Sequence, residues 1–296
     1  MITVILMYAI LAASFTVAKT AIAYATPYFL VGFRFTLAGT LFLTLQYIFN
    51  RKKFFLRKQD VPHFFWIALF YVYLAFVPEF WALQYLTSTK VVILYSITPF
   101  FVAIFAYFLA AERFTVKKIT GMILGFAGTI PILMIQDDIR EAATEILKIS
   151  LPEVVLLIAI ISGAYAWFPL KKLMNKGYSL PMINGVTMLL GGLAALTTSF
   201  FIEGVFVTHI FSFWPFLGWI LLLILLSNGL FYNLYGWHLR RYSFTLLSFA
   251  GFLCPIFGSL YGWYFLSESI KWNHFISLFL VGSGLYLFYR DELVER

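Results

Sequence analysis

The stretch PFFVAIFAYFLAAE, residues 99–112, decides the fold, because PIFGSLYGWYFLSE at 255–268 repeats its pattern. Both stretches begin with proline, continue through an apolar run and end in glutamate, at a constant offset of 156 residues. The same offset aligns Gly128 with Gly284 further along the chain. A proline, a glutamate and a glycine in one register predict an internal duplication.

The composition around these stretches indicates a lipid environment. The chain has 296 residues, of which 62% are hydrophobic and 11% are charged, whereas soluble domains carry about 25% charged residues. The mean hydropathy is +0.91. The single cysteine, Cys254, excludes an intrachain disulfide and a cysteine-rich metal site. The apolar N-terminus lacks a basic region and a cleavage site, so we expect it to form the first span, not a cleaved signal peptide.

Apolar runs of about 20 residues, the length that crosses a bilayer, recur along the chain. They predict ten helices, near 2–24, 27–49, 64–86, 89–111, 115–134, 153–173, 180–201, 214–238, 243–267 and 272–289. The chain is therefore expected to be an all-α integral membrane protein with about ten transmembrane helices in two five-helix halves. Because an odd number of spans inverts the second half, the halves are expected to be inverted repeats. Such repeats recur in secondary transporters, with the substrate site between them.

The two repeats are expected to occupy residues 1–134 and 153–289. Residues 135–152 form an acidic segment that is expected to link them outside the cytoplasm, and 290–296 are expected to be a cytoplasmic tail. Segments on the N-terminal side of the membrane carry fifteen Lys and Arg residues, and the opposite side carries five. Since positive charge collects on the cytoplasmic side, we expect both termini to be cytoplasmic in a cell (inner) membrane.

Residues 82–133 carry a second set of signals. They contain an Ala-Leu pair near the end of the third span, a proline inside the fourth, a glutamate closing it, and a fifth helix with regularly spaced glycines that suit helix packing. The segment SFTVAK (14–19) and Arg34 fit the first two spans of the same pattern. In these features the chain resembles the drug/metabolite transporter superfamily, in its EamA-like branch.

The resemblance covers nearly the whole chain, more weakly in the second half. It implies ten helices, duplicated five-helix halves and the transport of small organic metabolites. Members of the family carry amino acids, sugars, nucleotide-linked compounds and drugs, so the motif is specific for the fold and does not identify the cargo.

Three ionisable residues, Lys19, Arg34 and Glu79, are predicted to share one layer in the outer half of the first three spans. A carboxylate at membrane depth is costly and usually pairs with a cation or handles a substrate. One interpretation is a structural ion pair of Glu79 with Arg34 or Lys19. The other is a substrate-binding pocket whose surplus positive charge receives an anionic or zwitterionic small molecule, with Glu79 suited to proton coupling.

The eighth predicted helix presents polar side chains on one face. Asn228, Tyr232 and Tyr235 follow one another at helical spacing. Because amides facing lipid are unfavourable, this face is expected to line a cavity or to contact another helix. The three residues are therefore candidates for substrate binding, with helix packing as the alternative.

Prolines accompany the remaining candidates. Tyr95 precedes Pro99 on the fourth helix, and Tyr165 and Trp167 precede a proline on the sixth, so the three aromatic residues are candidates for a cavity wall. Pro99 and Pro255 occupy matching points of the two halves, inside predicted spans. Because a proline within a helix removes a hydrogen bond and bends the helix, this pair is predicted to act as hinges.

No enzyme, metal or cofactor signature occurs in the sequence. The four histidines lack metal-ligand spacing, and no phosphate-binding loop or ATPase module is present. The basic segment RKKFFLRK (51–58) is expected to contact the headgroups of membrane lipids and not a nucleic acid.

The sequence therefore predicts a secondary transporter that moves a small polar organic metabolite by alternating access. A flippase for a lipid or a lipid carrier is the alternative, and it predicts a groove that opens sideways to lipid. A polytopic membrane enzyme is a more distant alternative, because it would need convergent His or Asp pairs. The sequence predicts neither the substrate, the direction of transport, the coupling ion nor the oligomeric state.

Overall fold

The structure is a computed structural model that describes residues 1–86, 91, 94–133, 150–204, 210–266 and 272–294. In chain order its helices are α1 (Ile2–Ala21), η1 (Ile22–Tyr24), α2 (Pro27–Phe49), η2 (Arg51–Lys53), η3 (Lys58–Asp60), α3 (Val61–Ala68), η4 (Leu69–Tyr73), α4 (Leu74–Ala82), α6 (Thr98–Ala110), α7 (Val116–Leu133), α9 (Leu151–Asn175), α10 (Leu180–Ile202), α11 (Phe213–Leu223), η6 (Ile224–Phe231), α12 (Tyr232–His238), α13 (Phe244–Phe249), η7 (Ala250–Phe252), α14 (Leu253–Leu266) and α15 (Trp272–Val294).

Seven helical stretches of the described chain are long and apolar enough to cross a membrane. They are Ile2–Tyr24, Pro27–Phe49, Lys58–Ala82, Leu151–Asn175, Leu180–Ile202, Phe213–His238 and Phe244–Tyr261. The described residues form no strand, so the all-α membrane class is confirmed. The arrangement of ten spans in two inverted repeats stays a prediction, and its linker lies outside the described residues except for 150–152.

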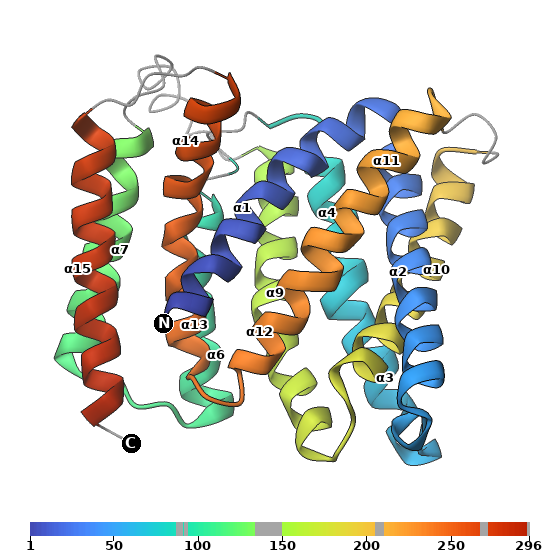
Figure 1. Ribbon diagram of the computed structural model, residues 1–296, viewed down its shortest axis with the longest axis horizontal. Helices are drawn as coiled ribbons and strands as arrows, with labels where there is room; N and C mark the ends of the chain where they lie inside the picture. Colours follow the sequence, from blue (N-terminus) through green and yellow to red (C-terminus); the bar gives the residue numbers. More distant parts are fainter. Residues whose placement is uncertain (87–90, 92–93, 134–149, 205–209, 267–271, 295–296) are drawn as a thin grey trace.

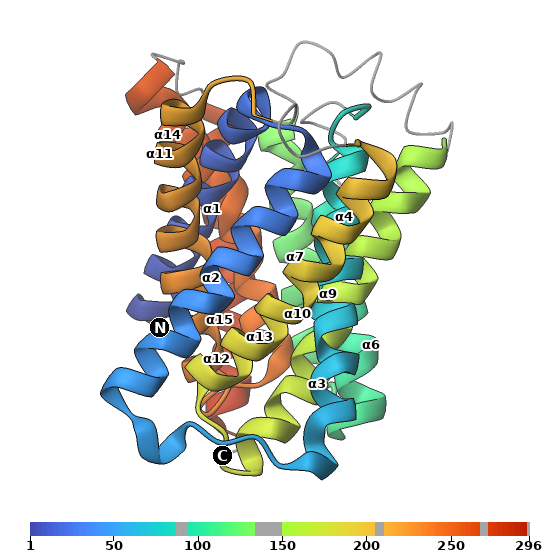
Figure 2. The same ribbon diagram turned by 90° about the vertical axis from the view of Figure 1, so that its right-hand side faces the viewer.

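Two antiparallel helix pairs flank the molecule. Figure 1 shows α2 and α10 together at one end of the long axis, and α7 and α15 together at the other. The remaining helices lie between the pairs, and Figure 1 shows α1 and the stretch from α11 to α12 running obliquely among them, whereas Figure 2 views the bundle from the side on which α2 and α10 lie. The buried core therefore lies between two outer walls, each made of one helix from either half of the chain.

Glycine allows the close approach within each pair. A Cβ atom on Gly192 of α10 would lie 2.4 Å from the backbone nitrogen of Thr36 on α2. In the other pair, a Cβ on Gly284 of α15 would lie 2.6 Å from the carbonyl oxygen of Gly121 on α7. No side chain fits at such distances, so small residues set the spacing of both pairs.

Polar caps join the ends of α2 and α10. Glu203, which follows α10, accepts hydrogen bonds from the backbone N–H groups of Tyr28 and Phe29 at 3.0 Å, in the first turn of α2. At the opposite end, Ser179 before α10 donates a hydrogen bond of 2.8 Å to Gln46 in the last turn of α2. Glu203 thus caps free backbone N–H groups at the start of α2, and Gln46 of α2 accepts the hydroxyl hydrogen of Ser179 at the start of α10.

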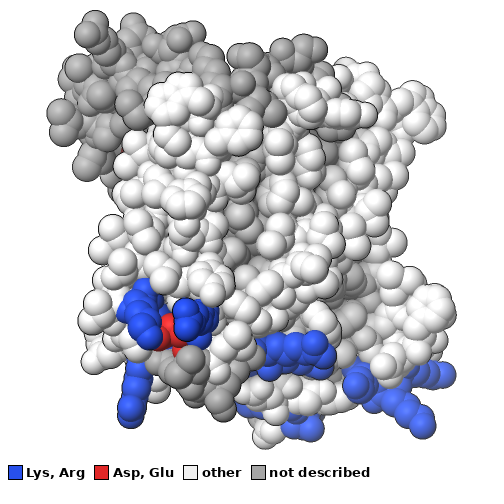
Figure 3. All heavy atoms as spheres, turned by 60° about the vertical axis from the view of Figure 1, so that its left-hand side comes forward, with Lys and Arg blue, Asp and Glu red and all other residues white. Residues whose placement is uncertain are grey.

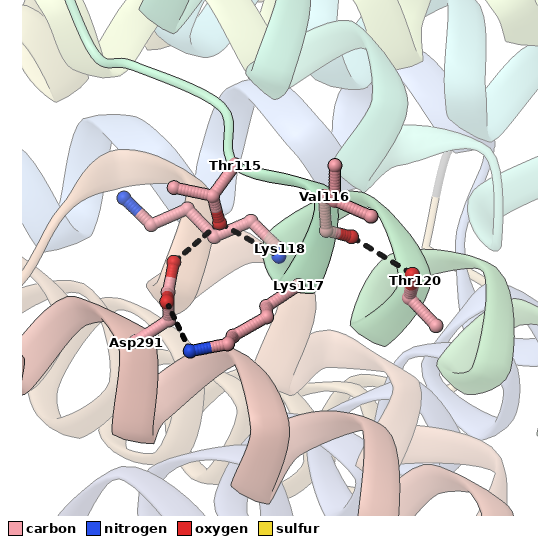
Figure 4. Close-up of polar contacts among 6 residues, drawn as sticks. All are labelled: Thr115, Val116, Lys117, Lys118, Thr120 and Asp291. Atoms are coloured by element: carbon pink, nitrogen blue, oxygen red, sulfur yellow. Dashed lines mark hydrogen bonds and ion pairs between the residues drawn. The ribbon is translucent and has the colours of Figure 1, made fainter.

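The α7–α15 pair is joined in a similar way (Figure 4). Thr115, just before α7, donates a hydrogen bond to the carboxylate of Asp291 near the end of α15, and accepts one from the backbone N–H of Lys118 at 3.2 Å. Lys117 also approaches Asp291 at 3.7 Å, but its side chain is 71% exposed. Since exposed ion pairs contribute little, the hydrogen bond from Thr115 is the main polar link.

Positive charge gathers at one end of the molecule, where Figure 3 shows Lys and Arg side chains along the lower edge of the face in view. At this end the fully buried Asp60 carboxylate accepts hydrogen bonds from Lys176 at 2.6 Å and from Tyr178 at 2.9 Å. Burial is the main reason that the pKa of Tyr178 is raised, so its hydroxyl stays protonated as a donor. These bonds tie the α2–α3 connection to the α9–α10 connection.

Candidate functional site

Arg34 is buried on the side of α2 that contacts η6. Its Nε donates to Oδ1 of Asn228 at 2.8 Å, and an Nη donates to the hydroxyl of Ser227 at 2.7 Å. The guanidinium also stacks over the rings of Phe35 and Phe76, at 4.8 and 5.4 Å from their centroids. The structure therefore brings together Arg34 and Asn228, and adds Ser227 and two rings that the sequence did not single out.

Glu79 lies buried on α4, beside the same layer. Its carboxylate accepts a hydrogen bond from the hydroxyl of Tyr95, which stands next to the turn before α6. In the described part of the chain no ion pair joins Glu79 to Arg34, although the two charges act on each other through the core. The ion pair with Arg34 that one interpretation predicted is thus not formed.

Lys19 is placed differently from the other two charged residues. It lies in the last turn of α1, and its side chain is exposed. The structure therefore does not bring it into the buried layer of Arg34 and Glu79.

Four aromatic residues pack between the charged layer and the basic end, and we call them the aromatic cluster: Tyr71, Trp167, Tyr232 and Tyr235. The Trp167 ring lies 4.1 Å from that of Tyr235 and 5.7 Å from that of Tyr232. The Tyr71 ring lies 5.1 Å from Trp167 and 5.1 Å from Tyr232. Phe76 connects the cluster to Arg34, because its ring is 6.5 Å from Tyr232.

Tyr165 lies outside the aromatic cluster. Its hydroxyl accepts a hydrogen bond of 3.1 Å from Trp66, and its ring packs 5.0 Å from Phe70. Residues two apart on an α-helix point in directions about 200° apart, so Trp167 and Tyr165 face opposite sides of α9. The structure joins only Trp167 to the other candidates.

Of the two predicted hinge prolines, Pro99 begins a helix and Pro255 lies within a longer helical stretch. Pro99 is the second residue of α6 and follows a turn at Ser96 and Ile97, while Pro255 is the third residue of α14 and follows the 3₁₀ turn η7. A proline in the first turn removes no helical hydrogen bond. At Pro99 the expected mid-helix bend is therefore corrected to a turn just before the proline, whereas Pro255 lies inside the helical stretch Phe244–Tyr261, as expected, next to its 3₁₀ segment.

Two further interruptions fall at corresponding places. The third predicted span contains the π-helical segment η4, and the eighth contains the π-helical segment η6. The offset of 156 residues carries 69–73 onto 225–229, inside η6. Such segments are rare in helices and are frequent at functional sites.

An amide network completes the interior. The Asn233 side chain donates to the backbone carbonyls of Gly229 at 2.8 Å and of Asn228 at 3.3 Å, both in η6. Tyr71 donates to Asn184 at 3.3 Å, which in turn contacts Asn233 at 3.5 Å. The network links the aromatic cluster to the π-helical segment η6, which contains Asn228.

This arrangement offers three kinds of contact to a small molecule. A guanidinium binds carboxylate or phosphate, a carboxylate binds an ammonium group, and aromatic faces stack on planar rings or attract cations. Among the described residues, no group of three or more His, Cys, Asp or Glu side chains could hold a metal ion.

Comparison with known proteins identifies the family. The profile of the EamA-like transporter family matches residues 1–134 and 151–290. The chain belongs to the EamA-like transporter family. It is accordingly a multi-pass membrane transporter of small metabolites, as the sequence predicted.

Relatives of this EamA-like transporter match it over almost its whole length. The S-adenosylmethionine/S-adenosylhomocysteine transporter of Chlamydia muridarum is 32% identical over 94% of this chain and 88% of its own length. The protein of the same name from Chlamydia trachomatis serovar L2 is 31% identical over 94% of this chain and 85% of its own. An uncharacterized transporter of Bacillus subtilis is 24% identical over 84% of this chain and 82% of its own.

A solved structure shares the fold of this EamA-like transporter. One crystal structure superposes with a TM-score of 0.70, covering 98% of this chain and 96% of that chain at 16% sequence identity. At this identity the likeness shows the fold alone.

Proposed function

We propose that this chain moves S-adenosylmethionine and S-adenosylhomocysteine across the membrane as a secondary transporter. The observation that supports these substrates is the 32% identity of this chain, over 94% of its length, to a transporter named for the two compounds. The buried charges and rings support it. Both compounds join an α-amino acid to an adenosine, so each presents a carboxylate, an ammonium group and a planar base.

In this proposal each part of the interior takes one part of the cargo. Arg34, held in place by Asn228, binds the carboxylate, and Glu79, held by Tyr95, binds the ammonium group. The aromatic cluster takes the adenine ring, and its electron-rich faces also favour the sulfonium cation of S-adenosylmethionine. Lys19 and Tyr165 are given no contact in this proposal, because the Lys19 side chain is exposed and Tyr165 contacts Trp66 and Phe70.

Transport is proposed to proceed by alternating access between inverted repeats at 1–134 and 153–289. The family profile supports this division, since it matches in two stretches with nearly these bounds. The helix pairing supports it too: α2 pairs with α10 and α7 with α15, which are the second and fifth predicted spans of either half. Each outer wall would then consist of two corresponding helices, one from each repeat.

The basic end is proposed to face the cytoplasm of a cell (inner) membrane, with both termini on that side. The gathering of Lys and Arg at this end supports the orientation.

Purified protein in proteoliposomes is expected to exchange labelled S-adenosylmethionine outside for S-adenosylhomocysteine inside, well above the rate of protein-free vesicles. An excess of unlabelled S-adenosylhomocysteine should compete, whereas adenosine and methionine alone should compete weakly. Labelling of Lys52→Cys in a Cys254→Ala background reports the orientation in whole cells, where an external reagent is expected not to reach it. Exchange no faster than in empty vesicles would refute the cargo.

The proline breaks are proposed as the hinges of this motion. Pro99→Ala and Pro255→Ala are each expected to slow exchange about tenfold while expression stays near the parental level, because alanine lets the helix extend backwards across the break. Pro181→Ala, in the first turn of α10 where a side-chain cap already starts the helix, is the control. Parental rates in both hinge variants would make the prolines purely structural.

One observation favours the flippase alternative. A groove of about 340 Å³ between α6 and α7 is lined by apolar side chains, among them Phe100, Ile104, Phe108 and Met122. An acyl chain would fit such a groove. Stimulation of lipid-probe translocation in the same vesicles, without exchange of S-adenosylmethionine, would support that function.

A further inference from the structure

A hollow of about 700 Å³ lies at the basic end, outside the proposed central site. It is formed where α6, α9, α12 and α15 end and α13 begins, so that five elements supply its walls. Its charged lining residues are Glu112, Lys171, Arg240, Arg241 and Glu292. Three cations thus face two carboxylates.

The two carboxylates are already engaged with the start of α13. Glu112 accepts from the backbone N–H of Phe244 at 2.8 Å and from the hydroxyl of Thr245 at 2.6 Å, through different oxygens. Glu292 accepts from the backbone N–H and the hydroxyl of Ser243, at 2.9 and 2.6 Å, again through both oxygens. Every carboxylate oxygen of the hollow therefore accepts a hydrogen bond from α13 or its cap.

The three cations are not engaged in this way. The Lys171 ammonium lies 4.5 Å from the centroid of the Phe244 ring, and the Arg241 guanidinium lies 4.5 Å from that of Trp237. Arg240 is exposed. Within the part of the chain that the structure describes, none of the three side chains forms an ion pair or donates a hydrogen bond. The donors of the hollow are thus available to an anion.

The hollow also adjoins the aromatic cluster. The Phe244 ring in its wall stacks on Phe168 at 4.0 Å, and Phe168 directly follows Trp167. A ligand held here would be one layer of rings away from the central site.

We propose that this hollow is a second binding site, in which Lys171, Arg240 and Arg241 hold the carboxylate of the metabolite before it enters the central site or after it leaves. Ammonium and guanidinium groups bind carboxylate and phosphate through the same charge-assisted contacts. The assignment of the carboxylate to the metabolite rests on the proposed function, whereas the anion chemistry does not. A lipid phosphate would offer the same chemistry, but the wall of rings leads inward from the hollow and so favours the metabolite.

The test compares the double variant Lys171→Gln/Arg240→Gln with Lys172→Gln. Lys172 is adjacent in the chain and exposed, and it does not line the hollow. Thermal unfolding in detergent is followed while sodium phosphate replaces chloride at constant ionic strength. We expect a saturable rise in Tm in the parent and in Lys172→Gln, and its loss in the double variant. An equal phosphate response in all three proteins would refute the site.

The source of the anion is then decided with two further probes. In an Arg34→Gln background, where the central site no longer holds the carboxylate, the double variant is expected to bind S-adenosylhomocysteine about tenfold more weakly than Arg34→Gln alone, the loss of roughly one charge-assisted contact. In that background the double variant should bind the decarboxylated analogue as Arg34→Gln alone does. If S-adenosylhomocysteine binding is unchanged and phosphatidylglycerol in nanodiscs alone restores the Tm rise, the occupant is a lipid and the proposal fails. If S-adenosylhomocysteine does not bind to the parent, the cargo is wrong, and the phosphate response still decides whether the site exists.

Discussion

Glu79→Gln is expected to fold normally and to lose about a hundredfold or more of its exchange rate. The change removes a buried charge that, in the proposed site, meets the ammonium group of the cargo. A buried charge pair that loses one partner costs about 3 kcal/mol or more, which corresponds to a factor of roughly one hundred. The exchange rate of S-adenosylmethionine in proteoliposomes, at matched protein content, measures this loss.

The structure explains why the fold should survive. Arg34 does not depend on Glu79, because Asn228 and Ser227 accept its hydrogen bonds. A glutamine carbonyl can still accept the hydrogen bond from Tyr95. The amide is also less costly to bury than a carboxylate. Tm and the size-exclusion profile of Glu79→Gln are therefore expected to match those of the parent.

Two controls separate transport from structure. Lys19→Gln removes a charge from an exposed position of the same half and is expected to leave exchange near the parental rate. Arg34→Gln should impair exchange as strongly as Glu79→Gln, and the double variant should not recover it. Recovery in the double variant would mean that the two residues only balance each other. A parental rate and an unchanged pH profile in Glu79→Gln would remove this residue from the site.

Gly192→Val is expected to prevent the protein from folding. The Cβ atom would lie 2.4 Å from the backbone nitrogen and 2.7 Å from the hydroxyl of Thr36, so α2 and α10 would have to separate. Overpacking against backbone of this kind costs about 3 kcal/mol or more. That is a large part of a typical stability of about 5–15 kcal/mol. The measurement is the yield and Tm of monodisperse protein in detergent.

Gly218→Val supplies the matched control. Gly218 also lies inside a helix, α11, but no atom lies within 4 Å of a Cβ placed there. Both substitutions exchange glycine for the same β-branched residue, so they share the change in helix propensity. Equal yields and equal Tm values for the two variants would show that the α2–α10 contact does not constrain the fold.

The lengths of the apolar runs, and the polar residues that interrupt them, made much of this structure predictable. The predicted range 27–49 coincides with α2, and 180–201 differs from α10 by one residue. Asn228, Tyr232 and Tyr235 stood out because amides and hydroxyls are costly next to lipid. The structure places all three in the buried interior, and it places Arg34 beside Asn228.

Other features had no such signal. Tyr71 and Phe76 belong to the interior, but in a chain that is 21% aromatic a single ring does not stand out. The partner of Glu79 depends on the rotation of α4 against its neighbours, which hydrophobic periodicity does not fix. Tyr165 could have been separated from Trp167 in the sequence, since helical spacing alone sets the two on opposite sides of their helix. The turn before Pro99 was expected to be helix because its residues are as apolar as those around it.

The π-helical segment η6 has a consequence for comparing this chain with its relatives. A π-helical turn holds one residue more than an α-helical turn, and Asn233 bonds to the carbonyls within it. A relative with an ordinary α-helix in this place would therefore lack one residue, and without that deletion its side chains would be rotated by about 100°. A one-residue gap between 224 and 231 in an alignment would mark a change in helix winding, and the residues on either side of it would still correspond.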